Sequence, residues 1–250
     1  MDADKKLLIA KTGDLFSLCD KHCEAKFSSF LDGGEAAFIE DEFHIPYGYN
    51  TMFFGGYENA ERKILGVFPD WQEAEQADFP ITSIRFDAPQ FRTLSHRDYL
   101  GTLMSLGIDR SKTGDILCDS SGAYVFVSSD IADYVVRNIK KVANTGVKGH
   151  IVNIGEVALP KAETAKKMCV CASLRLDAVI AAALNISRTN AEKLIKEGYV
   201  KVNHRETADR AGQVEAGSLI SVRNHGRFIL ADTGNNTRKG RLHITIEKFL

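Results

Sequence analysis

The chain has 250 residues, enough for two or three domains with separate hydrophobic cores. Its 44% hydrophobic and 26% charged residues are typical of a globular protein, and no apolar run is long enough to cross a membrane. The N-terminus carries acids early and lacks the apolar region of a secretory signal, so we expect a cytoplasmic protein.

The net charge of −1 hides an uneven distribution along the chain. Residues 172–250 hold 13 Lys and Arg against 8 Asp and Glu, a balance of +5, whereas the preceding 171 residues have a balance of −6. Because nucleic acid attracts basic surfaces, the C-terminal part is the expected nucleic-acid contact.

Five cysteines, an odd number, favour reduced thiols in a cytoplasmic chain. Cys19, His22 and Cys23 could share one helical face and hold a metal, but no second pair follows at zinc-finger spacing. We expect these side chains to serve in packing, and we expect no metal and no cofactor.

Apolar residues between 3 and 45 recur at helical spacing and predict a small N-terminal helical unit. Asp32 and Glu35 have the spacing of a capping box. The Gly- and aromatic-rich residues 46–62 predict a connector with an exposed tip, in which Gly55-Gly56 forms a structural turn rather than a phosphate loop. We place this first unit with its connector at residues 1–60.

The pattern becomes mixed α and β from residue 63 onward. Strands are predicted at 63–68, 81–86, 114–118, 122–127 and 150–154, and helices at 96–106 and 129–142. From residue 81 the order is β-α-β-β-α-β, which predicts a ferredoxin-like (split βαββαβ) central domain at residues 61–157. Tyr124 and Phe126 alternate on one strand without the RNP sequences of base-stacking sheets, so any RNA contact here should be directed by shape or backbone.

His96, Arg97 and Asp98 invite a catalytic interpretation, but they follow Ser95, a plausible helix N-cap. Because no Ser, Cys or second acid is placed to complete a catalytic set, we expect no catalytic residues.

The last third of the chain begins with a predicted linker at 158–172, followed by a domain at 173–250. Apolar residues at 176, 179, 180 and 183 predict one helix, and Ser187 is the expected cap of a second. Gly198 should end that helix in a left-handed conformation. Strands are then expected from 199, at 220–222, at about 227–232 and at about 241–247.

This stretch resembles the RNA-binding domain of the ribosomal S4 type. The resemblance rests on Arg-Leu-Asp at 175–177, Ser-Arg at 187–188, Leu-Ile at 194–195, Gly198, Val-x-Val-Asn at 200–203, and Gly217 with Ile220 and Val222. His204 and Ser218 depart from the pattern, where Gly and Asp are usual, which puts the type of the turn after Asn203 in question. The expected fold class is therefore α+β, with an S4-type domain of two helices and a small sheet.

The polar residues outside the apolar pattern of this domain are mostly basic, and several cluster around the second helix, whose N-terminus attracts anions. A solvated charged face is the alternative. The residues expected to bind RNA are Arg175, Ser187, Arg188, Thr189, Lys193, Lys196, Tyr199, Lys201, Asn203, His204, Arg205, Arg223 and Arg227.

Arg188 follows the cap and lies in the first helical turn, where a cation is disfavoured by the helix dipole. We therefore expect it to hold a phosphate with Arg175 beside it. The alternatives are that it reaches solvent or pairs with Glu192.

From about residue 27 the whole chain also resembles the bacterial YlmH-type proteins, on GGYENAERKILGVFP at 55–69, HRDYLGTLMSLGIDRSKTGDI at 96–116, SLRLDAVIA at 173–181 and SVRNHGRF at 221–228. The resemblance implies a non-enzymatic, monomeric factor of ribosome-associated quality control that binds 23S rRNA and peptidyl-tRNA on the large (50S) ribosomal subunit, with other quality-control or division proteins as further partners.

Two other classes stay open. One is an RNA-modifying enzyme of the pseudouridine synthase class, because S4-type domains accompany such enzymes and Arg175-Leu176-Asp177 is similar to their Arg-Leu-Asp motif. The flanking Gly and Thr-x-Gly of that motif are missing, however. The other class is a division-site adaptor whose acidic N-terminal domains recruit proteins.

Overall fold

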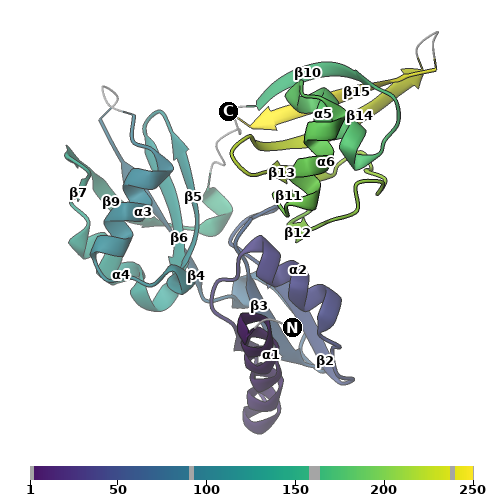
Figure 1. The fold of residues 1–250 in the computed structure, drawn as a ribbon. Helices are drawn as coiled ribbons and strands as arrows, with labels where there is room; N and C mark the ends of the chain where they lie inside the picture. Colours follow the sequence, from purple (N-terminus) through teal and green to yellow (C-terminus); the bar gives the residue numbers. More distant parts are fainter. Residues whose placement is uncertain (1–2, 90–92, 158–163, 237–239, 250) are drawn as a thin grey trace. The chain divides into compact units, whose positions relative to one another are not determined.

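A computed structural model describes residues 3–89, 93–157, 164–236 and 240–249 (Figure 1). The chain divides into two compact units, Met1–Pro160 and Lys161–Leu250, and each is described by itself. Within the described residues, no helix combines the length and the apolar character that a membrane crossing requires.

The first part of unit one, the N-terminal subdomain (residues 3–69), is not purely helical as predicted. Helices α1 (Ala3–His22) and α2 (Gly33–Glu42) accompany a sheet of order β1-β3-β2. The strands of this sheet are β1 (Lys26–Phe27), β2 (Tyr49–Phe54) and β3 (Ile64–Pro69). The predicted connector therefore contains β2, and the strand predicted at 63–68 pairs with β2 rather than with the central sheet.

The capping box predicted at Asp32 and Glu35 is present at the start of α2. The carboxylate of Asp32 accepts hydrogen bonds from the N–H groups of Gly34 and Glu35, both at 2.8 Å, and Glu35 accepts one from the N–H of Asp32 at 2.7 Å. The predicted capping box is thus confirmed. Phe16 of α1 and Ile39 of α2 share one hydrophobic core with Val67 of β3.

The central domain (residues 81–152) has the predicted order β-α-β-β-α-β. Its antiparallel sheet has the order β5-β6-β4-β9, and the short strands β7 and β8 form a separate hairpin before β9. The elements are β4 (Ile81–Asp87), α3 (His96–Ser105), β5 (Thr113–Asp119), β6 (Gly122–Ser128), α4 (Ser129–Asn138), β7 (Lys141–Val142), β8 (Thr145–Gly146) and β9 (Lys148–Val152). Helix α4 ends four residues before the prediction because residues 139–142 leave the helix and bury Ile139 and Val142 in the domain core.

The loop between β2 and β3 contains Gly55 and Gly56, and it packs the N-terminal subdomain against the central sheet. Gly56 has a φ of +100°, and a Cβ added there would lie 2.4 Å from the ring of Phe126, so only glycine fits. The hydroxyl of Tyr57 then donates to the carboxylate of Asp115 at 2.8 Å. These contacts agree with the structural interpretation of Gly55-Gly56.

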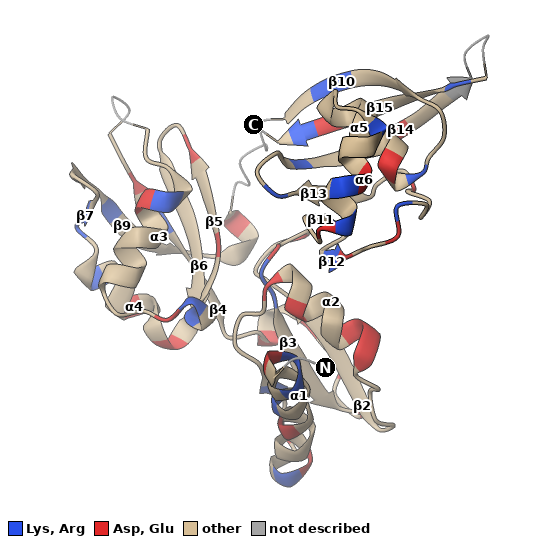
Figure 2. Ribbon diagram, in the orientation of Figure 1, with Lys and Arg blue, Asp and Glu red and all other residues tan. Residues whose placement is uncertain are grey.

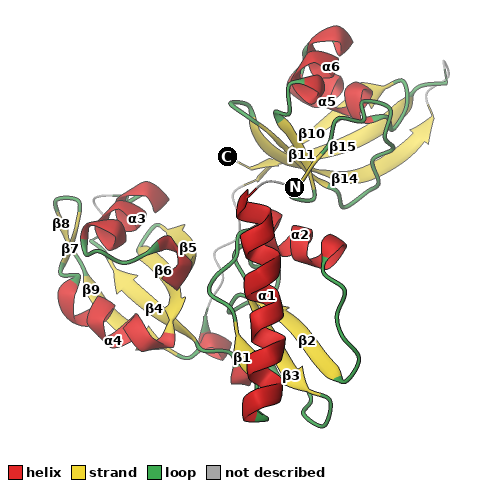
Figure 3. Ribbon diagram, turned by 60° about the horizontal axis from the view of Figure 1, so that its bottom comes forward, coloured by secondary structure: helices red, strands yellow, loops and turns green. Residues whose placement is uncertain are grey.

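The described strands of the second unit, the C-terminal unit, form one sheet of order β10-β15-β14-β13-β11-β12. Helices α5 (Leu176–Leu184) and α6 (Arg188–Lys196) pack on one face of it (Figure 3). The strands are β10 (Thr164–Cys171), β11 (Val200–Val202), β12 (Arg205–Glu206), β13 (Leu219–Val222), β14 (Gly226–Asn236) and β15 (Leu242–Phe249).

The predicted linker at 158–172 is wrong for most of its length. Thr164 to Cys171 form β10, which pairs with β15 along its whole length, from Thr164 opposite Phe249 to Cys171 opposite Leu242. Cys171 is buried in the core of the C-terminal unit. The first part of the predicted linker, 158–163, lies outside the described residues.

Candidate nucleic-acid interface

The residues predicted to bind RNA fall into two groups in the C-terminal unit. The first group lies on the helices or their N-terminal ends: Arg175, Ser187, Arg188, Thr189, Lys193 and Lys196. The second group belongs to the sheet and its turns: Tyr199, Lys201, Asn203, His204, Arg205, Arg223 and Arg227. The structure therefore does not bring all thirteen residues onto one surface.

The first group is organised by Asp177, whose side chain has no exposed area. Arg188 donates to Oδ2 of Asp177 from Nε at 3.0 Å and from Nη2 at 2.8 Å. Arg175 donates to Oδ1 and Oδ2 of the same carboxylate at 3.3 and 3.2 Å. Burial raises the pKa of Asp177, but the hydrogen bonds from Arg175 and Arg188 outweigh this and hold the pKa below its ordinary value.

This geometry corrects the interpretation of Arg188. Its guanidinium forms an ion pair with Asp177 of α5. This contact within the fold explains why a cation stands in the first turn of α6. The predicted alternative partner, Glu192, instead accepts a hydrogen bond from Arg210 at 2.8 Å. The Arg188 side chain still keeps 48% of its area exposed, which leaves part of the guanidinium open to a ligand.

The rest of the first group follows the exposed side of α6. Ser187 is the N-cap, as predicted, and its hydroxyl accepts a hydrogen bond from the N–H of Asn190 at 3.1 Å. Thr189 and Lys196 are exposed. Lys193 lies 3.8 Å from Glu197 one turn later, a weak surface pair that a ligand can replace at small cost.

The second group is centred on a shallow groove of about 490 Å³ on the sheet. Lys201, Ser221 and Arg227 stand opposite one another on β11, β13 and β14. Their neighbours Val200, Val222 and Phe228 point into the core beneath the helices, and side chains alternate along a strand. The row Lys201–Ser221–Arg227 therefore faces away from α5 and α6.

Aromatic rings accompany the cations of this groove. The guanidinium carbon of Arg223 lies 5.4 Å from the ring centroid of Tyr199, and that of Arg227 lies 5.1 Å from the ring centroid of Phe249. Tyr199 is 37% exposed. Lys201 lies 3.7 Å from Glu206, which lines the same groove. We call Tyr199, Lys201, Ser221, Arg223 and Arg227 the sheet groove.

Asn203 and His204 form the turn between β11 and β12. Both have a positive φ, +49° and +67°, as a two-residue hairpin of type I′ requires. The N–H of Asn203 donates to the carbonyl of Leu219 at 2.8 Å, and its side-chain oxygen accepts from the N–H of Leu219 at 2.9 Å. His204 thus adopts the backbone conformation that favours glycine, which answers the question that its departure from the S4 pattern raised.

Three residues of the candidate interface were missed by sequence reasoning. Ser221 and Phe249 belong to the sheet groove or support it, and strand alternation would have found Ser221 once the register was known. Asp177 was noticed only as part of a motif. Its role as the shared partner of two arginines depends on a contact across eleven residues that no local pattern encodes.

The sheet of the central domain offers no open aromatic platform among its described residues. Phe126 is fully buried by the N-terminal subdomain, and Tyr124 packs under Arg85, whose guanidinium carbon lies 4.7 Å from the ring centroid. Arg85 in turn donates to both oxygens of Asp119, at 2.6 and 3.1 Å. The expected contact through shape or backbone stays a prediction.

The other candidate clusters have structural roles. Ser95 and Asp98 form a capping box at the start of α3, as the cap interpretation predicted. Cys19 is buried and Cys23 is exposed. In the part of the chain that the structure describes, no three or more His, Cys, Asp and Glu side chains are grouped as metal ligands would be.

Two family models match: residues 74–156 match one described as "Putative RNA-binding domain in YlmH", and residues 174–220 match the S4 domain. "Ribosome-associated protein quality control protein P2" of Bacillus subtilis (strain 168) is 33% identical over 247 residues, which cover 98% of this chain and 95% of the relative. This chain belongs to the YlmH family.

The S4 match confirms the predicted S4-type domain, and α5 and α6 lie inside the matched range. A solved structure, "Cell division protein ylmH from Streptococcus pneumoniae", aligns with 64% of this chain and 97% of its own length, at a TM-score of 0.53 and 15% identity. At that identity, the likeness shows a shared fold for this part of the YlmH-family chain.

Proposed function

We propose that this YlmH-family protein is a non-enzymatic RNA-binding protein that docks on 23S ribosomal RNA and peptidyl-tRNA at the large ribosomal subunit, within ribosome-associated quality control. The name of the Bacillus subtilis relative supports the process, and the S4 domain supports RNA as the ligand.

The observation that carries the proposal is the sheet groove. Lys201 and Arg227 stand on one face of the sheet, flanked by Arg223 over the ring of Tyr199. Cations hold phosphates, and an aromatic ring beside them can stack on an unpaired base. Arg188, anchored on Asp177, adds a second basic point on the helical face.

The geometry of Asp177 argues against the pseudouridine synthase class. A catalytic aspartate must reach the nucleobase that it attacks. The Asp177 side chain has no exposed area, and its oxygens accept hydrogen bonds from Arg175, Arg188 and the N–H of Ala178. The Arg-Leu-Asp sequence at 175–177 therefore has a packing role.

Sedimentation tests the proposal. The full chain is mixed with salt-washed large subunits purified from Bacillus subtilis and run through a sucrose gradient. We expect the parent to travel with the subunits and K201Q/R227Q to stay at the top. A parent protein that remains at the top would contradict the proposal.

A second measurement addresses chemistry. The purified protein is incubated with ribosomal RNA or tRNA, and the nucleosides are then analysed by mass spectrometry. We expect no new pseudouridine or methyl group. A modification that depends on the protein would show that it is an enzyme.

A further inference from the structure

The central domain carries a basic surface that the proposed function does not use. Arg97 lies at the start of α3, and Arg137 near the end of α4. Lys140 follows α4, Lys141 opens β7, and Lys148 opens β9. We call these five residues the basic hairpin surface. All five are exposed, and Figure 2 shows blue ribbon segments near β7 and β9.

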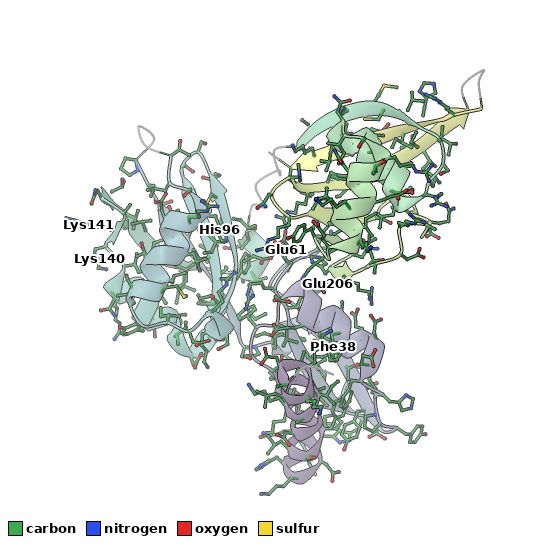
Figure 4. The ribbon with its side chains drawn as sticks, in the orientation of Figure 1. Phe38, Glu61, His96, Lys140, Lys141 and Glu206 are labelled. Carbon is green, nitrogen blue, oxygen red and sulfur yellow. The ribbon has the colours of Figure 1, made fainter. Side chains whose placement is uncertain are left out.

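Backbone pairing holds the three lysines close together. The N–H of Val147 donates to the carbonyl of Lys140 at 3.0 Å, and Lys141 stands opposite Gly146 in the β7–β8 hairpin. Lys148 follows Val147 directly. Figure 4 shows Lys140 and Lys141 on the same outer edge of the domain.

The charge of these cations is not balanced by carboxylates of the fold, although the Lys140 ammonium donates one hydrogen bond to the carbonyl of Val136 at 3.2 Å. Across residues 3–89, 93–157, 164–236 and 240–249, none of the five takes part in an ion pair. Asp87, opposite Lys148 in the sheet, is engaged with Arg85 at 3.3 Å instead. Like charges that gather without carboxylates destabilise a fold, so their clustering points to an external anion.

A shallow groove of about 430 Å³ runs beside these cations. Its floor is the outer side of α3 at Gly101, Thr102 and Ser105, whose small side chains leave room for an extended ligand. A Cβ added at Gly101 would meet nothing within 4 Å. Arg97 and Lys141 stand along its walls.

The one carboxylate that lines the groove is turned to its own helix. Asp98 accepts hydrogen bonds from the N–H and the hydroxyl of Ser95, at 2.8 and 2.7 Å. The Asp98 carboxylate is therefore engaged in capping α3, and the cations Arg97 and Lys141 remain along the groove.

We propose that the basic hairpin surface is a second RNA contact, which binds backbone phosphates through Lys140, Lys141 and Lys148 with Arg97 beside them. The proposal rests on the proposed RNA-binding function. It also fits the blocked aromatic face of the central sheet, because a phosphate contact needs no stacking platform. The central domain then contacts the RNA backbone and does not distinguish one base sequence from another.

Salt titration of full-length variants tests this contact, with protein-free 23S ribosomal RNA as the probe. K140Q/K141Q removes two charges from the surface. K5Q/K6Q is the matched control, since Lys5 and Lys6 are adjacent and exposed on α1. Each lost phosphate contact should lower the slope of log affinity against log salt by about 0.7–0.9. We expect K140Q/K141Q to lower the slope by about 1.5 and the affinity roughly 5- to 50-fold at about 0.1 M salt.

The control should keep the slope of the parent, and both variants should melt like the parent. If K140Q/K141Q also keeps that slope while K201Q/R227Q loses part of it, the second contact is wrong and the proposed function stands. If neither variant changes the slope, both proposals fail.

Lysine acylation followed by mass spectrometry gives an independent test of the ligand class. RNA should protect Lys140, Lys141 and Lys148 while Lys5 and Lys6 stay reactive. Poly-glutamate at the same charge concentration should protect them less. Equal protection by poly-glutamate would overturn the choice of RNA.

Discussion

Arg188 donates two hydrogen bonds to Oδ2 of Asp177, a carboxylate without exposed area at the start of a different helix. The pair ties α6 to α5 through side chains, in addition to their shared apolar core. A charge buried in this way is stable only while its partners remain. Arg188 is therefore a structural residue whose exposed edge also remains a proposed RNA contact.

Arg188→Ala should lower the free energy of unfolding of the C-terminal unit. The substitution leaves Asp177 with Arg175 as its single cationic partner, and we expect a loss of about 1–3 kcal/mol. Lys196→Ala, an exposed position on the same helix, should change it by less than about 0.5 kcal/mol. Urea denaturation gives both values, and equal midpoints for the two variants would refute the structural role of Arg188.

His204→Gly should raise stability. His204 has a φ of +67°, where a non-glycine side chain is strained, and glycine relieves that strain at some cost in unfolded-state entropy. The expected net gain is about 0.5–1 kcal/mol. Asn203→Gly is the control, because it removes the hydrogen bond to Leu219 and should give no gain. A lower denaturation midpoint for His204→Gly would mean that the His204 side chain makes a stabilising contact.

Acid should destabilise the central domain through Asp119. Hydrogen bonds from Arg85 lower the pKa of this carboxyl to about 2, from an ordinary value of 3.8. A carboxyl whose folded pKa is depressed stabilises the fold above its unfolded pKa, and this contribution disappears as the pH falls from about 4 to about 2. The contribution at neutral pH is roughly 2 kcal/mol.

Asp119→Asn should therefore unfold more easily at pH 7 and show a shallower loss of stability between about pH 4 and pH 2. Thermal melts across this range measure both effects. Asp133→Asn, on the exposed side of α4, serves as the control. Should Asp119→Asn keep the acid sensitivity of the parent, another group must be responsible.

The sequence alone predicted the elements whose signals are local. The capping box at Asp32 and the caps Ser95 and Ser187 were recognised, because each depends on residues within one turn. The β-α-β-β-α-β order of the central domain was also predicted, since hydrophobic periodicity marks each of its strands and helices.

The elements that depend on distant pairing were missed. Strand β1 has only two residues and β2 lay in a predicted connector, so the sequence indicated a strand at 63–68 but not the sheet that unites β1, β3 and β2. Strand β10 contains the adjacent Lys166 and Lys167 and resembled a linker, and only its pairing with β15 shows its true role. The cations of the sheet groove were predicted from the sequence. The strand register that aligns Lys201, Ser221 and Arg227 was not, because it depends on pairing between strands that are distant in the sequence.

The most direct test of the central claim is the affinity of the full chain for 23S ribosomal RNA across a salt series, with K201Q/R227Q against the parent. Lys201 and Arg227 should each contact about one phosphate, so the variant should bind more weakly and its slope of log affinity against log salt should fall by about 1.5. Circular dichroism should show that its fold is unchanged. An affinity and a slope equal to those of the parent would contradict the assignment of the sheet groove as the RNA-binding surface.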